Sequence, residues 1–347
     1  FFMANYEGRN LRQSSLATYS VPTAAMFAGD FSAWGTTIYD SNNLDSNGNK
    51  TPFPGNKIPA SRIDPISKKF LKYYVSSNLP GFSSNYVQTN SSPNNRQGFT
   101  SRVDFVESAR SQWTGRFSWG DEDQSSTGIS ITGSKIITNY KQWLATNTRT
   151  IAPSLVNEAR FGYTKMGNSL GTRSAYESDT VSDIGIPGLA PGPPVSWGVP
   201  MASFAGDGFV AIGDAQDGPF FIDDNTLQLV DNISWTRGKH SFRFGFEYTR
   251  QNYNQIGNQF SRGQFAFQPN ATMSSDRKGG DAFAEFLLGD LWNSIVAVAL
   301  AQAEFQRNTV AAFADDTWKL TPKLTLSLGL RYELTPPWYN NLNNLFI

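Results

Sequence analysis

Large apolar residues alternate with polar ones along several segments, and this period of two most limits how the chain can fold. After Lys239, one side carries Phe242, Phe244, Phe246 and Tyr248, and the other carries Ser241, Arg243, Gly245, Glu247 and Thr249. The pattern returns after Lys323 and also occupies residues 112–121 and 155–165. Because successive side chains of a β-strand point to opposite faces, these segments are predicted to be strands with one apolar and one polar face.

Strand length favours a membrane wall over a soluble sandwich. At about 3.3 Å per residue, the segment from Lys239 to Tyr248 covers roughly 30 Å, or about 21 Å of depth when tilted near 45°. An outer-membrane barrel has an apolar band of roughly 25 Å. Trp235 and Trp318 precede short turns, so aromatic residues flank the band at both ends, as interfacial girdles do.

Two acidic residues oppose a membrane wall. Asp231 shares the predicted apolar face with Leu229 and Ile233, where an ionised carboxylate is unfavourable. Asp316 shares a face with Trp318 and is expected near the interface.

The connections alternate between short and long. Residues 107–110, 152–154, 236–239 and 321–323 are rich in turn formers and are predicted to close four hairpins. Residues 122–134, 168–222 and 268–306 are predicted to be long loops, because they are dense in Gly, Pro, Asn and Ser. Short turns on one rim and long loops on the other are typical of bacterial outer-membrane barrels.

The expected fold class is all-β: a partial antiparallel transmembrane β-barrel with long extracellular loops and one or two short helices. We expect about ten strands, one near Phe1, eight in the hairpins and one near residues 263–268. Residues 1–347 would form part of one barrel domain, with 10–95 as a long loop insertion and 96–335 as strands and loops. Short helices are expected at Ile66 to Tyr74, after Pro65, and at residues 280–288.

Composition removes several kinds of chemistry. The chain has no Cys and a single His, His240, so thiol chemistry and multi-histidine metal sites are excluded, and a Ser-His-Asp triad would have to use His240. Its 29 basic and 29 acidic residues give no electrostatic reason to bind nucleic acid. We therefore expect no enzyme activity, no cofactor and no metal site. His240 is expected at the rim that carries the short turns.

Three acidic stretches are candidate sites, but none has the pattern that its chemistry needs. Residues 43–48 resemble the start of a calcium loop, but Pro54 stands where a bidentate Glu is needed, so a polar turn is expected. Asp223-Asp224 and residues 121–123 are adjacent acids, which point to opposite faces of a strand and do not form a catalytic pair.

Four stretches resemble the barrel region of TonB-dependent outer-membrane receptors, and most closely the Oar-like group. They are PTAAMFAGDF (22–31), IPASRI (58–63), VDNISWTRGKHSFRFGFEY (230–248) and DDTWKLTPKLTLSLGLRYE (315–333). The resemblance implies a barrel of about 22 strands with a plugged lumen. The plug and any N-terminal domain are expected to lie outside this chain. Residues 339–347 lack the final aromatic strand of the family, so the chain is interpreted as a fragment.

The polar faces of the predicted strands carry charges of both signs. These residues are expected to face the lumen, where they could contact a plug or solute, although opposite charges on neighbouring strands would satisfy one another. The set comprises Arg102, Asp104, Arg116, Glu158, Arg160, Arg243, Glu247, Arg331 and Glu333.

The resulting hypothesis is a fragment of a receptor in the bacterial outer membrane that takes up a scarce solute with energy from the inner-membrane TonB complex. Its expected partners are outer-membrane lipid, its own plug, the TonB complex and an unknown solute. A passive or adhesive outer-membrane barrel and a secreted glycan-binding β-protein remain as alternatives.

Overall fold

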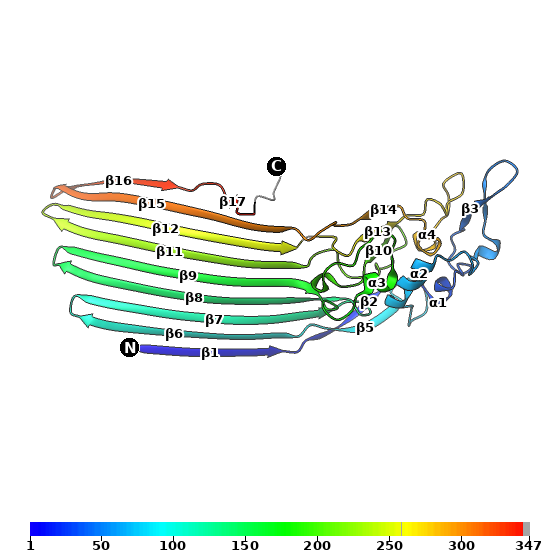
Figure 1. Ribbon diagram of the computed structural model, residues 1–347, viewed down its shortest axis with the longest axis horizontal. Helices are drawn as coiled ribbons and strands as arrows, with labels where there is room; N and C mark the ends of the chain where they lie inside the picture. Colours follow the sequence, from blue (N-terminus) through cyan, green and yellow to red (C-terminus); the bar gives the residue numbers. More distant parts are fainter. Residues whose placement is uncertain (258, 343–347) are drawn as a thin grey trace.

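The computed structural model describes residues 1–257 and 259–342, and its main element is an open antiparallel sheet of ten strands (Figure 1). Nine long strands lie in the order β1, β6, β7, β8, β9, β11, β12, β15, β16. The short strand β17 (Tyr339–Asn340) pairs with the beginning of β15, at Phe305 and Gln306. Their bounds are β1 Phe2–Leu11, β6 Asn94–Ser108, β7 Ser111–Thr127, β8 Gly133–Ala152, β9 Leu155–Thr172, β11 Phe220–Arg237, β12 His240–Gly257, β15 Gln302–Thr321 and β16 Leu324–Leu334. The sheet does not close, which fits a piece of a larger barrel.

All four predicted hairpins are confirmed. The turns fall at residues 109–110, 153–154, 238–239 and 322–323, and they share one end of the sheet, at the left of Figure 1. The strands are longer than the alternation suggested. β8 and β15 each have 20 residues, or roughly 66 Å at about 3.3 Å per residue, so they extend well beyond an apolar band of roughly 25 Å.

Two sequence-based assignments were wrong. Residues 122–134 do not form a long loop, because β7 and β8 continue to Thr127 and from Gly133, which leaves only 128–132 between them. Residues 264–267 form a strand, β13 (Gln264–Phe267), but it does not belong to the wall. It pairs with β10 (Met201–Phe204) and β14 (Asn293–Ile295) in a separate sheet.

The long links fold together into one compact unit at the end of the wall opposite the turns, which we call the cap (Figure 1). It comprises residues 12–93, 128–132, 173–219 and 259–301. The strand pairs β2 (Ser14–Tyr19) with β5 (Tyr86–Ser91) and β3 (Tyr39–Leu44) with β4 (Lys50–Pro52) lie in it. Its helices are α1 Ala24–Phe27, α2 Pro65–Phe70, α3 Thr180–Ile184, α4 Ala282–Leu288 and the 3₁₀ turns Pro54–Asn56, Leu71–Tyr73 and Pro194–Ser196.

Both predicted helices are confirmed. α2 begins at Pro65, after Asp64, whose carboxylate accepts hydrogen bonds from the backbone N–H groups of Ile66 and Ser67. α4 begins after Asp281 and ends at Gly289, which adopts φ +77° in the left-handed region. None of the described helices has the length and apolar character to cross a membrane.

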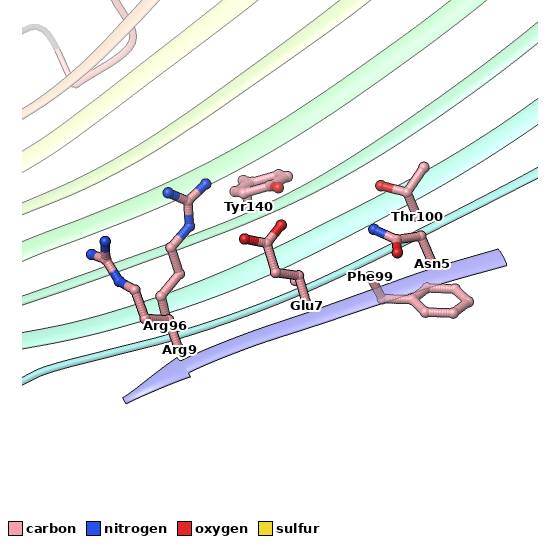
Figure 2. Close-up of a pocket in the computed structure, with 8 residues that line it drawn as sticks. Asn5, Glu7, Arg9, Arg96, Phe99, Thr100 and Tyr140 are labelled. Atoms are coloured by element: carbon pink, nitrogen blue, oxygen red, sulfur yellow. The ribbon is translucent and has the colours of Figure 1, made fainter. Parts of the chain in front are cut away.

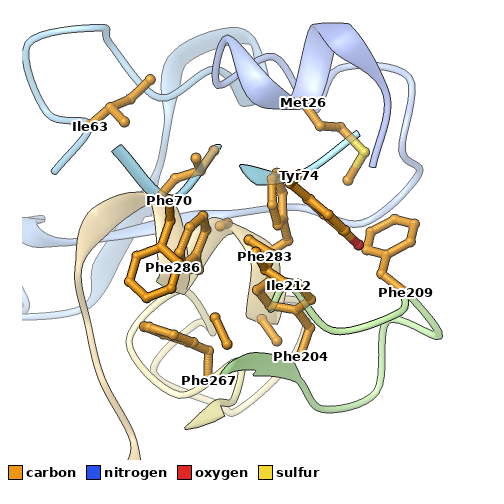
Figure 3. Close-up of a cluster of buried hydrophobic side chains, with 14 of the residues drawn as sticks. Met26, Ile63, Phe70, Tyr74, Phe204, Phe209, Ile212, Phe267, Phe283 and Phe286 are labelled. Atoms are coloured by element: carbon orange, nitrogen blue, oxygen red, sulfur yellow. The ribbon is translucent and has the colours of Figure 1, made fainter. Parts of the chain in front are cut away.

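An aromatic core holds the cap together. Phe204, Phe283 and Phe286 pack with ring centroids 5.3–5.6 Å apart, and Phe267 lies 5.3 Å from Phe286 (Figure 3). Phe70, from α2, meets Phe286 edge-on at 5.9 Å. These residues come from three different links, so the core forms only when those links meet.

A buried polar cluster joins the cap to the wall. The Arg262 guanidinium donates to the carbonyl oxygens of Ala215 at 2.7 Å and Asp217 at 3.2 Å. The Asp214 carboxylate accepts from the backbone N–H of Gly133, the first residue of β8, at 3.0 Å and from Val199 at 2.8 Å. Burial raises the pKa of Asp214 and lowers that of Arg262.

Two further acids are buried at the start of α4. Asp281 accepts from the backbone N–H of Ala284 at 2.8 Å, and Asp207 accepts from Phe283 at 2.8 Å and Ala282 at 3.3 Å. Desolvation by burial, and secondarily the neighbouring charge of Asp207, raise the pKa of Asp281 to about 7. Desolvation also raises the pKa of Asp207.

Candidate functional site

The outward face of the wall is an apolar band. Strand pairing places Phe161, Leu229, Tyr248 and Val310 in one row across four strands, with Phe244 and Phe246 on the same face. All of them except the partly buried Tyr248 are exposed, with Phe246 at 48% and Leu229 at 41%. A contiguous exposed surface of this kind is what lipid chains cover.

Aromatic residues border the band at both ends. On the cap side, Trp143 lies 5.4 Å from Phe117 and 5.5 Å from Tyr163, and just beyond them the same face carries Lys141 and Lys165. On the turn side, Trp235 lies 5.5 Å from Phe242. His240 stacks there on Trp318 at 5.1 Å, so its predicted position at the rim is confirmed. This is the girdle arrangement of membrane barrels.

The two acids that were expected on the apolar face have local partners. Asp231 accepts a hydrogen bond of 2.6 Å from the side-chain amide of Asn157, on the neighbouring strand. Asp316 lies 2.6 Å from Nδ1 of His240. Both carboxylates are therefore hydrogen-bonded in place, which removes much of the objection to a membrane-facing position.

The opposite face of the wall, which we call the inward face, is polar and carries the nine charged residues named above. The register puts Asp104, Arg160, Glu247 and Glu333 in one row, and places Arg102, Arg116, Glu158, Arg243 and Arg331 on the same face. Ion pairs join Arg102 to Asp104 at 2.9 Å, Arg160 to Glu158 at 3.0 Å and Arg331 to Glu333 at 3.0 Å.

The remaining members of this set have other neighbours. Arg116 donates to the side-chain oxygen of Gln142 at 2.8 Å, and Glu247 accepts from Gln228 at 2.8 Å. Arg243 stands opposite Asp315 in the register. Most of these charges are thus satisfied within the wall, and they do not gather into one centre.

The acidic motifs form ordinary structure. The Asp45 carboxylate accepts from the backbone N–H of Asn47 and Asn49, both at 2.8 Å, as in a polar turn. Asp223 pairs with Lys165 at 3.3 Å, and Asp123 with Lys135 at 3.6 Å. Within residues 1–257 and 259–342, no group of three or more His, Asp or Glu side chains is placed to hold a metal ion.

A polar hollow of about 120 Å³ opens on the inward face near the cap (Figure 2). It is lined by Asn5, Glu7 and Arg9 of β1, Arg96, Gly98, Phe99 and Thr100 of β6, and Tyr140 of β8. The sequence analysis did not identify these residues. The alternation of Asn5, Glu7 and Arg9 marked a shared face, but only the pairing of β1 with β6 brings Arg96 opposite Arg9.

An open sheet with an apolar outward face between aromatic girdles, a polar inward face and short turns at one end defines the wall of an outer-membrane β-barrel. The sequence supports this class over almost its whole length. Residues 1–346 match the family model of the outer membrane beta barrel domain, and the chain belongs to that family. The protein is therefore placed in the bacterial outer membrane.

Three solved structures are similar to part of this chain. The outer membrane transporter YddB of Escherichia coli is 9% identical over 78% of this chain and 30% of its own, with a TM-score of 0.41. FpvA of P. aeruginosa, bound to a heterologous pyoverdine, is 10% identical over 74% of this chain and 34% of its own, with a TM-score of 0.43. The siderophore receptor PiuA of Acinetobacter baumannii is 12% identical over 71% of this chain and 37% of its own, with a TM-score of 0.39. The chain thus spans about a third of the length of these proteins. No curated protein matches the sequence.

Proposed function

We propose that this chain is part of a TonB-dependent receptor that carries a scarce solute across the outer membrane, and that it is not an enzyme. In this proposal a plug domain fills the barrel, and the inner-membrane TonB complex supplies the energy that moves the plug. The Oar-like group is the proposed subfamily.

The observation that carries the proposal is the breadth of the wall. The ten-stranded sheet is still open, whereas about eight strands already suffice to close a small barrel around packed side chains. Barrels of about 22 strands leave a lumen that a plug occupies. A wide barrel with a charged inward face therefore favours a plugged receptor over a small, solid barrel.

The family-like stretches support the same proposal. Residues 230–248 form the hairpin of β11 and β12, and residues 315–333 form that of β15 and β16. Each thus lies in the strand-turn-strand context that the resemblance requires. Neither stretch identifies the solute.

Energy-dependent uptake by the complete gene product tests the proposal. Cells that express it would be supplied with labelled ferric siderophores, saccharides and peptides. We expect accumulation of at least one probe, and we expect that accumulation to stop when a protonophore collapses the inner-membrane potential or when TonB is deleted. Accumulation that continues in either case would instead identify a passive barrel.

Conductance in a planar bilayer gives a test that does not require the solute to be known. We expect the purified protein to remain closed until denaturant loosens the plug. A steady open conductance in native buffer would contradict a plugged receptor, and extraction from cells without detergent would favour the secreted alternative.

A further inference from the structure

Two arginines face each other on the inward face, and neither forms an ion pair within the described chain. Arg9 of β1 stands directly opposite Arg96 of β6. On its other side Arg96 stands opposite Glu122 of β7, whose carboxylate accepts a hydrogen bond of 2.6 Å from the Asn94 side chain. Like charges at directly opposed positions of a sheet repel each other. The wall contains a second such pair, Arg102 opposite Arg116, but there Asp104 lies 2.9 Å from Arg102 and Gln142 lies 2.8 Å from Arg116.

Glu7 is spaced to neutralise Arg9 but does not do so. Residues two apart on a strand share a face. At this spacing the acid and arginine form an ion pair at three places on the inward face, Arg102–Asp104, Glu158–Arg160 and Arg331–Glu333. Within the described chain, no ion pair of 4.0 Å or less involves Arg9, Arg96 or Glu7. Figure 2 shows the Glu7 carboxylate directed toward Tyr140 instead.

An aromatic ring lies beside the arginines. The Tyr140 ring extends over Gly120 of the neighbouring strand, where a Cβ would lie 2.5 Å from its Cε1 atom. With one side over the glycine backbone, Tyr140 is still 37% exposed toward the hollow. Both guanidinium groups project to the same side of the sheet as this ring (Figure 2).

We propose that the hollow binds an acidic saccharide, with its carboxylate between Arg9 and Arg96 and its sugar ring against Tyr140. This inference rests on the proposed function and names the class of solute. Two guanidinium groups present forked donors to a carboxylate. Glu7 accepts hydrogen bonds from sugar hydroxyl groups, and Asn5 and Thr100 line the same hollow.

The position of the hollow suits capture of an incoming solute. Tyr6 and Phe99, which oppose each other on the outward face, are the last large aromatic residues before the cap on these two strands. Arg9 and Arg96 lie further toward the cap, so the hollow is at the outer mouth of the wall. Cations at the mouth of a polar lumen that form no ion pair within the described chain raise the local concentration of anions.

Equilibrium binding to the complete gene product in detergent tests the inference. The probes are D-glucuronate, the neutral D-glucose as its match, and inorganic phosphate as an anion without a ring. We expect glucuronate to bind at least about tenfold more tightly than either, because only glucuronate uses both the arginines and Tyr140. Equal binding of glucuronate and glucose, or of glucuronate and phosphate, would overturn the proposed class.

Three variants and a control assign the binding to these residues. Arg9→Gln and Arg96→Gln should each weaken glucuronate binding at least about tenfold, and Tyr140→Leu should remove the preference for glucuronate over phosphate. Arg307→Gln, on the same face of β15 but outside the hollow, should bind like the unchanged protein. Thermal unfolding without ligand shows whether a variant still folds. Arg96→Gln should be about as stable as the parent, because it removes both the repulsion from Arg9 and the attraction to Glu122. Undiminished binding by both arginine variants, or loss in the control, would contradict the inference.

The glucuronate-binding test and the uptake test of the proposed function can fail independently. Energised uptake of neutral solutes only, with no glucuronate binding, would support the proposed receptor and contradict the acidic-saccharide site. Glucuronate binding in a barrel that conducts passively would support the site and contradict the TonB-dependent mechanism.

Discussion

Glycines on the inward face make room for a side chain from the neighbouring strand. A Cβ at Gly245 of β12 would overlap the Phe313 ring of β15, and a Cβ at Gly120 of β7 would meet the Tyr140 ring of β8. Gly329 likewise stands beside the Asp315 carboxylate. This explains why glycine interrupts the alternation in strands that are otherwise rich in β-forming residues.

Gly245→Ala should therefore destabilise the wall. The added methyl group must displace Phe313 from its rotamer, which we expect to cost about 1–3 kcal/mol in free energy of unfolding. Gly115→Ala is the matched control, because a Cβ there meets no atom within 4 Å. Urea unfolding in lipid vesicles measures both, and equal stability of the two variants would contradict the steric explanation.

Asp281 should make the cap less stable as the pH rises toward neutrality. Its folded pKa is raised to about 7, mainly by burial, whereas an unfolded Asp titrates near 3.9. Between about pH 4 and pH 7 the unfolded cap has released this proton and the folded cap has kept it, so stability is highest below pH 4 and falls up to about pH 7. Asp207, with its raised pKa, acts in the same direction, and the buried Tyr74 phenol stays neutral throughout this range.

Asp281→Asn isolates this effect. The amide oxygen retains the hydrogen bond from Ala284, and the ionisation is removed. Relative to the parent, we expect the variant to gain roughly 1–3 kcal/mol of cap stability between pH 5 and pH 8. Amide hydrogen exchange in α4, compared between the two proteins at each pH, measures it. A ratio of exchange rates between the two proteins that does not change with pH would show that Asp281 ionises normally.

At the level of elements, the sequence predicted the membrane part of each strand better than the rest. The period of two and the turn residues located all four hairpins. Beyond Tyr248, the outward face of β12 continues with Arg250, Asn252 and Asn254, so the alternation of apolar and polar residues ends although the strand does not. Backbone pairing with β11 and β15 extends the strand to Gly257. This pairing does not depend on side-chain hydropathy, so the alternation did not predict it.

This change along β12 predicts where the lipid ends. Phe246→Arg places a charge inside the apolar band and should destabilise the inserted protein by about 2–4 kcal/mol. Asn252→Arg, on the same face of the same strand but beyond the aromatic border, should cost about 0–1 kcal/mol. Unfolding from vesicles by denaturant measures the difference, and similar values for the two variants would place the band elsewhere.

At the level of the whole molecule, the cap and the hollow could not be read from local patterns. The cap core joins Phe70, Phe204 and Phe283, which belong to different links, and no single link shows a strong period of its own. Composition therefore suggested loops, since Gly and Pro were visible and the long-range packing was not. The hollow requires the registers of four neighbouring strands, β1, β6, β7 and β8, before Arg9, Arg96 and Tyr140 meet.

The wall and the cap should consequently respond separately to mutation. Phe283 is fully buried among rings from several links, so Phe283→Ala should remove about 3–5 kcal/mol from the cap. The wall does not depend on this core, because its strands are held by backbone pairing and by lipid. In the complete gene product, we expect limited proteolysis to cut residues 179–214 faster in the variant, while the folded barrel keeps its heat-dependent electrophoretic mobility. Phe244→Ala, on the lipid-facing side, should leave the rate of cleavage in the cap unchanged. If Phe283→Ala unfolded the wall as well, the two parts would form one cooperative unit, and the cap would have to be regarded as part of what closes the barrel.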